Sequence, residues 1–133
     1  MKLESQGNTI QKPAREVYDF LTNIKNFEKL MPENISKFEV IDETTFVFAL
    51  KGMPEIPLKL QDSIPVSKVI LGAGGGKIDF SLTGDITEID ETSSSVKLSF
   101  EGNFNPMMAM MIKGPITKFL ETLNTNLPVA LDQ

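Results

Sequence analysis

IDFSLTGDI at residues 78–86 and VKLSFEGNF at residues 96–104 are the two stretches that decide the fold. In both, apolar and polar side chains alternate, and a period of two is typical of a β-strand with one buried face. The polar residues 90–94 between them predict a turn. The two stretches therefore predict an antiparallel hairpin.

The phase of this alternation predicts which side chains are buried. We expect Phe80 and Phe100 to lie in the interior. We expect Asp79 and Glu101 to lie in solvent. A shift of one residue in the strand register would reverse all four predictions, because the side-chain period is two.

The same alternation runs upstream as far as residue 36. Turn residues interrupt it at Asp42-Glu43 and at Lys51-Gly52. Its apolar positions are Phe38, Val40, Phe46, Phe48, Leu50, Ile56, Leu58, Leu60, Val69 and Leu71. Residues 36–104 therefore predict a meander of six antiparallel strands with one apolar and one polar face.

Downstream of residue 104 the apolar period changes to that of a helix. Asn105 suits the cap of a helix and Pro106 its first position. Apolar residues then recur at helical spacing, at Ile116, Phe119, Leu120, Leu123 and Leu127. Gly114-Pro115 predicts a kink or a break, because proline has no amide hydrogen to donate within a helix.

The beginning of the chain predicts a strand followed by two short helices. Residues 1–10 are expected to form the strand. Pro13 suits the opening of the first helix. Asn26 suits the cap of the second, which we expect to end at Met31-Pro32.

Two segments near the N-terminus carry a resemblance to a known superfamily. They read Ile10-x-x-Pro13-x-x-x-Val17-Tyr18-x-Phe20-Leu21 and Asn26-Phe27-x-x-Leu30-Met31-Pro32. Together with the meander and the final helix, they resemble the START-like or SRPBCC superfamily over nearly the whole chain. The resemblance implies an α+β helix-grip fold, a curved antiparallel sheet of about seven strands around a long C-terminal helix. We therefore expect one START-like domain over residues 1–133.

The resemblance also implies a cavity between the sheet and the long helix, commonly filled by an apolar ligand. The superfamily includes polyketide cyclases, lipid-transfer domains, pollen-allergen-like proteins and co-chaperones. Its members thus include enzymes, carriers and interaction modules, and a fold by itself does not determine which of these a protein is.

The composition excludes several kinds of chemistry. The chain has no cysteine and no histidine, which removes disulfides, thiolate metal sites and the usual general base. Its net charge is −5, and Arg15 is its only arginine, so we expect no nucleic-acid partner. We predict no metal site, no cofactor and no catalytic residues. The residues that alternate inward in the meander are apolar and offer no acid or base.

The glycine-rich residues 71–78 do not form a phosphate-binding loop. A Walker loop requires Ser or Thr after the lysine, and here Ile78 follows Lys77. The stretch instead predicts a hairpin tip between two strands. The longest apolar run, residues 107–112, is far shorter than a membrane span needs, and no signal peptide is visible. We therefore expect a cytoplasmic protein without stable membrane insertion.

Four methionines crowd into residues 107–111, and no single helix face holds them all. Methionine is flexible and adapts to irregular surfaces. Three interpretations are open: packing of the core, lining of a cavity or its mouth, and contact with a membrane. If the methionines line a cavity or its mouth, the residues expected to bind the ligand are Phe46, Phe48, Leu58, Phe80, Leu82, Leu98, Phe100, Met107, Met108, Met111 and Phe119.

The leading hypothesis is a protein that binds or carries an apolar small molecule, such as a lipid, a sterol or a polyketide-like compound. One alternative is a cyclase- or hydratase-like enzyme that acts on an apolar substrate. Another is a co-chaperone-like interaction module with a packed core. The interior distinguishes them, since an open apolar cavity favours the carrier and a solid core the interaction module. The sequence does not determine the oligomeric state.

Overall fold

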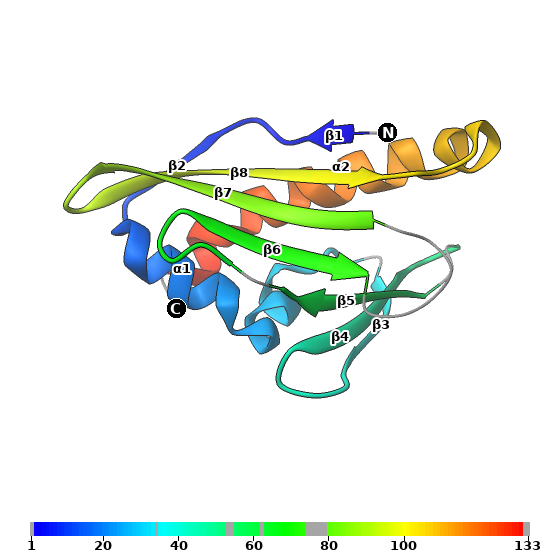
Figure 1. The fold of residues 1–133 in the computed structure, drawn as a ribbon, viewed down its shortest axis with the longest axis horizontal. Coiled ribbons are helices and arrows are strands. Elements are labelled where there is room, and N and C mark those ends of the chain that lie inside the picture. Colours follow the sequence, from blue (N-terminus) through cyan, green and yellow to red (C-terminus); the bar gives the residue numbers. More distant parts are fainter. Residues whose placement is uncertain (1, 34, 53–54, 62, 74–79, 132–133) are drawn as a thin grey trace.

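The computed structural model describes residues 2–33, 35–52, 55–61, 63–73 and 80–131 (Figure 1). The elements are β1 (Lys2–Glu4), β2 (Asn8–Ile10), α1 (Ala14–Thr22), the 3-10 helix η1 (Ile24–Leu30), β3 (Ile35–Val40), β4 (Thr45–Leu50), β5 (Ile56–Leu60), β6 (Lys68–Ala73), β7 (Phe80–Asp90), β8 (Ser93–Gly102) and α2 (Pro106–Leu131). This is the predicted order of a strand region, short helices, a meander and a long final helix.

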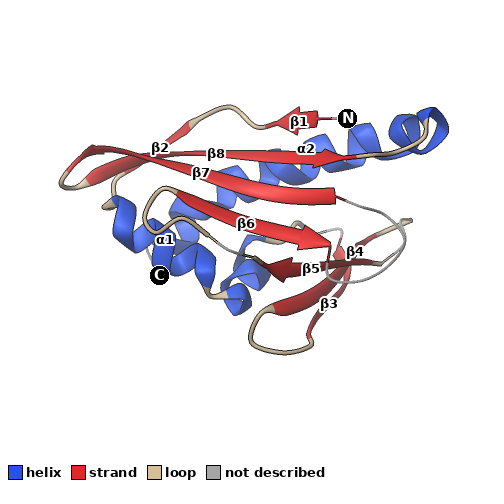
Figure 2. Ribbon diagram, in the orientation of Figure 1, coloured by secondary structure: helices blue, strands red, loops and turns tan. Residues whose placement is uncertain are grey.

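The strands form one 8-stranded antiparallel sheet in the order β1-β8-β7-β6-β5-β4-β3, with β2 also paired to β8. Strands β3 to β8 follow one another in the chain and in the sheet, as the period-two pattern predicts. The helices lie against one face of this sheet, and α2 crosses behind β7 and β8 in the view of Figure 2. The α+β helix-grip prediction is confirmed.

The N-terminal segment differs from the single strand that we expected. It forms two short strands on β8, with residues 5–7 between them. Buried Ser5 bridges this break, because its backbone amide donates to the Leu98 carbonyl at 2.8 Å and its hydroxyl oxygen accepts from the Leu98 amide at 3.0 Å. The side chain thus replaces a strand hydrogen bond at the interruption.

The first helix begins directly after Pro13, as predicted. The cap of the second helical segment was assigned wrongly to Asn26. Asn23 is the cap, and its side-chain oxygen accepts from the Lys25 amide at 3.3 Å. Asn26 lies inside η1 and donates to the Phe20 carbonyl at 3.0 Å. The segment is a 3-10 helix that begins at Ile24, directly after the end of α1 at Thr22, so the residue between the two helices is Asn23.

The long helix α2 continues through Gly114 and Pro115 from residue 106 to residue 131, so this dipeptide does not break it. Asn105 caps the helix as predicted, because its side-chain oxygen accepts from the Met108 amide at 2.8 Å. The buried side of α2 carries Ile116, Phe119, Leu120, Leu123, Leu127 and Ala130.

The predicted strand phases hold for Phe46, Phe48, Leu58 and the other inward positions of the central strands, but Val40 at the end of β3 was predicted to face inward and is exposed. Phe80 and Phe100 are buried, and Glu101 is exposed. Asp79 and residues 74–78 of the glycine-rich stretch lie outside the described residues. The beginning of that stretch belongs to β6, where Leu71 pairs with Leu82 and Gly72 with Ser81.

Candidate functional site

The inward face of the sheet is built from rows of apolar side chains. The strand register pairs Phe46 with Leu58, and it pairs Leu82 with Phe100. Leu98 pairs with Gly84, and the Leu98 and Leu21 methyl groups lie 3.5 and 3.6 Å from the position of a β-carbon added to Gly84. The alternation of the sequence therefore produces one continuous apolar surface facing α1, η1 and α2.

One aromatic stack joins this surface to the long helix. The rings of Phe48 and Phe119 lie 4.7 Å apart between centroids and are inclined by only 6°. Phe46 stacks on Phe27 of η1 at 5.4 Å and on Phe38 of β3 at 5.2 Å. These contacts connect β3, β4, η1 and the middle of α2.

A second aromatic stack closes the end of the sheet near the start of α2. The Phe80 and Phe100 rings lie 5.6 Å apart, and the Phe100 and Phe104 rings 6.0 Å apart. Gly102 makes this possible, since an added β-carbon would lie 2.5 Å from the Phe104 ring and 2.9 Å from the Phe80 β-carbon. The glycine thus allows Phe104 to fold back over β8.

The predicted burial of the methionines under the sheet is wrong for Met107 and Met111, whose exposed fractions are 75% and 70%. A helix advances about 100° per residue, and both side chains fall opposite the side that buries Ile116. Met108 is half-buried and lies three turns before Phe119 on the same side. Half-buried Ile112 lies between them and packs against the core.

The other predicted ligand-binding residues, Phe46, Phe48, Leu58, Phe80, Leu82, Leu98, Phe100 and Phe119, are all buried. The void that Leu21, Phe27, Val69, Leu71, Leu82, Gly84 and Leu98 line has a volume of about 10 Å³. That is close to the smallest space that holds one water molecule. A gap of about 50 Å³ lies at Pro32, Leu50, Pro115, Lys118, Phe119 and Thr122, where α2 passes the ends of η1 and β4. Around these residues the interior is closely packed.

The buried polar residues of the described part of the chain are Ser5, Thr45, Ser93 and Ser94, and none of them is ionisable. Ser94, for example, donates to the Lys12 carbonyl at 3.0 Å. The amide oxygen of half-buried Asn124 is also buried and has no hydrogen-bond partner among the described residues. The described interior therefore offers no buried acid or base. The described residues of the chain also contain no group of three acidic side chains that could hold a metal ion.

Shifted pKa values occur at exposed groups outside this interior. The Lys97 ammonium, 2.7 Å from the Glu4 carboxylate, lowers the pKa of Glu4, and Glu4 in turn raises the pKa of Lys97. The Thr92 amide donates to the Asp90 carboxylate at 2.8 Å and lowers its pKa. These shifts arise from surface pairing and turn geometry, so they do not mark a catalytic centre.

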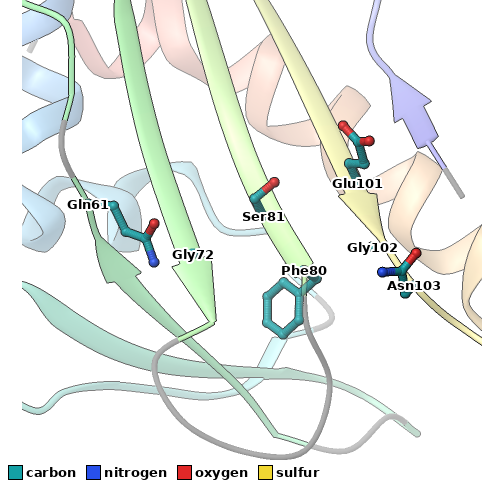
Figure 3. A pocket seen from close by; sticks show the side chains of 7 residues that line it. All are labelled: Gln61, Gly72, Phe80, Ser81, Glu101, Gly102 and Asn103. Carbon is teal, nitrogen blue, oxygen red and sulfur yellow. The ribbon is translucent and has the colours of Figure 1, made fainter.

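A pocket of about 320 Å³ lies at one end of the sheet, and sequence reasoning did not predict it (Figure 3). Its lining consists of Gln61, Gly72, Phe80, Ser81, Glu101, Gly102 and Asn103. Ser81 pairs with both Gly72 and Glu101, so these residues form one row on the outward face of the sheet. The alternating pattern predicts a polar, solvated face there. The available signal was Gly72, whose missing side chain lets the Gln61 side chain lie over the strand.

The described residues of this pocket offer hydrogen-bonding groups and a single carboxylate. The Gln61 side chain lies over Gly72. Of the described lining residues only Glu101 is ionisable, and it is exposed. The described lining therefore offers one solvated carboxylate and the amides of Gln61 and Asn103 for polar contact with a small molecule.

Helices among the described residues include none that is both long enough and apolar enough to cross a membrane. No protein-family model matches the sequence, and no curated protein matches it.

Solved structures share the architecture. A START superfamily protein from Mycobacterium smegmatis superposes with a TM-score of 0.76 at 10% identity, covering 99% of this chain and 97% of that one. A norcoclaurine synthase point mutant from Thalictrum flavum, in complex with a transition-state analogue, gives 0.69 at 13% identity over 96% and 94% of the two chains. The Zhui aromatase/cyclase from Streptomyces sp. R1128 gives 0.67 at 12% identity over 98% and 90%.

The antiparallel sheet and the long helix that it grips define a protein of the helix-grip class. Among these, the chain has the START-like, or SRPBCC, fold over nearly its whole length. At these identities the likeness shows the fold and leaves the function to the site.

Proposed function

We propose that the chain binds an apolar small molecule between its sheet and the first half of α2. The observation that carries the proposal is the chemistry of the facing surfaces. The inward sides of β4, β5, β7 and β8 and the adjoining side of α2 present aromatic and aliphatic groups, and the described interior has no buried ionisable group. Such a surface suits a ligand recognised by burial of apolar area.

The two aromatic stacks mark the walls of the proposed site. Phe48 and Phe119 form one wall, and Phe80 and Phe100 form the other. Half-buried Met108 and Ile112 lie on the same side of α2 as Phe119 and would form its rim. Methionine at the rim suits ligands of varied outline, because its side chain has many accessible rotamers.

Among the described residues, binding on this proposal requires movement. A site for a small molecule typically encloses about 300–1,000 Å³. The described voids between the sheet and the helices measure about 10 and 50 Å³. The ligand would therefore separate the first half of α2 from the sheet, and the cost of that opening would lower its apparent affinity.

A titration with a fluorescent fatty acid and a fluorescent sterol tests the proposal. Wild type should bind one of them saturably. Ile112→Glu puts a charge at the rim and should weaken binding at least about tenfold, because burial of a carboxylate is costly. Met110→Glu is the matched control, since that side chain is 83% exposed on the outer side of the same helix. Melting curves establish that both variants are folded.

A second candidate function follows from the packed interior. If no apolar probe binds saturably, the close packing around Phe46, Leu58 and Leu120 favours the co-chaperone-like interaction module instead. An enzyme resembling the cyclases has less support, because the described interior lacks an acid or base that could act on a bound substrate. The same titration separates the carrier from the interaction module.

A further inference from the structure

The first two turns of α2 carry an exposed apolar surface. Met107, Met110 and Met111, here called the methionine patch, have exposed fractions of 75%, 83% and 70%. They lie opposite the buried side of the helix and contribute nothing to the core. Other large exposed apolar side chains, such as Ile41, Ile64 and Ile89, are scattered over separate loops and strand ends. Contiguous apolar exposure of this kind marks a surface that another body covers.

The shape of the molecule makes this patch accessible to a flat surface. The first turns of α2 project beyond the end of β8 along the long axis of the molecule (Figure 1). Gly114, one turn after Met110, is exposed, and a β-carbon added there would meet no atom within 4 Å. The patch is therefore a protruding tip. A peptide that binds by insertion needs a groove, and the patch does not form one.

The charge around the patch differs from that of the rest of the chain. The chain carries 18 acidic and 13 basic residues, yet residues 102–120 contain no acidic residue. The same segment contains Lys113 and Lys118, both exposed. Neither side chain has an ion-pair partner among the described residues, whereas Lys37 and Lys97 on the sheet are paired with glutamates. The tip thus combines apolar side chains with the positive charge of Lys113, and Lys118 adds a second positive charge farther along the helix, beside Pro32 and Leu50.

We propose that the methionine patch docks the protein on the surface of an anionic lipid bilayer. The methionines would enter the boundary between headgroups and acyl chains, as the apolar side of an interfacial helix does. Lys113 and Lys118 would contact lipid phosphates, since lysine side chains extend toward charge while their methylenes stay against apolar surface. This contact lies on the surface and requires no membrane-spanning segment.

A second copy of the chain is a poorer occupant of the same surface. A two-fold symmetric contact places the same patch on both sides of the interface. Centred on the methionines, it would bring the lysines of both copies together without an acidic residue from the segment to neutralise them. Like charges in such a contact oppose association. An anionic surface supplies the opposite charge that the segment lacks.

Sedimentation with lipid vesicles tests the proposal. Wild type should bind mixed phosphatidylcholine–phosphatidylglycerol vesicles, bind phosphatidylcholine vesicles more weakly, and lose affinity as salt is raised. The combined change Met107→Ser, Met110→Ser and Met111→Ser should weaken binding at least about tenfold, and Lys113→Glu with Lys118→Glu should do the same.

A matched control replaces three exposed apolar residues elsewhere. Ile41→Ser, Ile64→Ser and Ile89→Ser alter side chains that are 55%, 55% and 53% exposed, and vesicle binding should be unchanged. Melting curves compare the folding of the two triple variants. The measurement uses no apolar probe, so its result is independent of whether the interior binds a ligand.

Three results would overturn the proposal. Wild type that does not bind the mixed vesicles is one. A methionine variant that binds them as well as wild type is another. The third is a wild-type dimer in sedimentation equilibrium that the methionine changes convert to a monomer, because a second copy would then cover the patch.

Discussion

Removal of the Phe119 ring is the most direct perturbation of the contact between α2 and the sheet. Phe119 is 3% exposed, and its ring stacks on Phe48 at 4.7 Å. Truncation of a buried phenylalanine to alanine costs about 3–5 kcal/mol, from lost burial and the cavity that remains. A domain of this size has a total stability of roughly 5–15 kcal/mol, so Phe119→Ala should be folded but marginal. Its midpoint of thermal unfolding should fall by roughly 10–20 °C.

The stacking itself is measured with a double-mutant cycle. Phe48→Leu and Phe119→Leu keep most of the apolar volume, so all four proteins of the cycle should fold. Their coupling energy should be about 0.5–1.5 kcal/mol, as for other aromatic pairs. Urea denaturation provides the free energies. Val129→Ala is the control on the same helix, because Val129 is 62% exposed and its loss should change stability by less than about 0.5 kcal/mol.

Two results would refute this reasoning. If Phe119→Ala costs less than about 1 kcal/mol, α2 does not pack on β4 at this point in solution. If the coupling energy is zero while both single changes destabilise, the two rings are buried separately and the stack does not hold the helix to the sheet.

Gly114→Ala should stabilise the protein by about 0.5–1 kcal/mol, because the glycine lies inside α2 and the added methyl meets no atom within 4 Å. Gly102→Ala should cost about 1–3 kcal/mol, because its methyl would lie 2.9 Å from a β-carbon on β7. If urea denaturation shows that Gly114→Ala and Gly102→Ala change the free energy of unfolding in the same direction, the described packing is contradicted. Ser5→Ala should cost about 1–3 kcal/mol by leaving the Leu98 amide without its acceptor, and hydrogen exchange at Leu98 no faster than in wild type would count against it. The ionised Asp90 side chain should contribute to the free energy of unfolding in full above its ordinary pKa of about 3.9. This contribution should be lost as the pH falls through the lowered pKa of Asp90 in the folded state. Asp90→Ala should therefore lose less stability than wild type on acidification below about pH 4. If the melting temperatures of the two proteins fall by the same amount over this pH range, the Asp90 carboxylate does not contribute to stability.

Much of the candidate site was predictable because its residues obey simple periods. Phe46, Phe48, Phe80 and Phe100 alternate with polar neighbours, and a strand with one buried face must turn them inward. The methionines were harder. Between residues 107 and 112 every side chain is apolar, so the pattern does not show which side of the helix is buried. The outward pocket was missed for a related reason, since Ser81 and Glu101 lie where a solvated strand face is expected.

The sequence by itself determined the element order, the strand phases and the burial of the final helix after Gly114. These follow from local periods of side-chain polarity, which the backbone geometry of strands and helices converts directly into faces. Only the tertiary structure decided which methionines face solvent, because the rotation of α2 about its axis is set farther along by Ile116, Phe119 and Leu123. It also decided that Ser5 interrupts the first strand and that the inward aromatic rings of the described residues stack on one another. Those features depend on contacts between residues far apart in the chain, which no local period records.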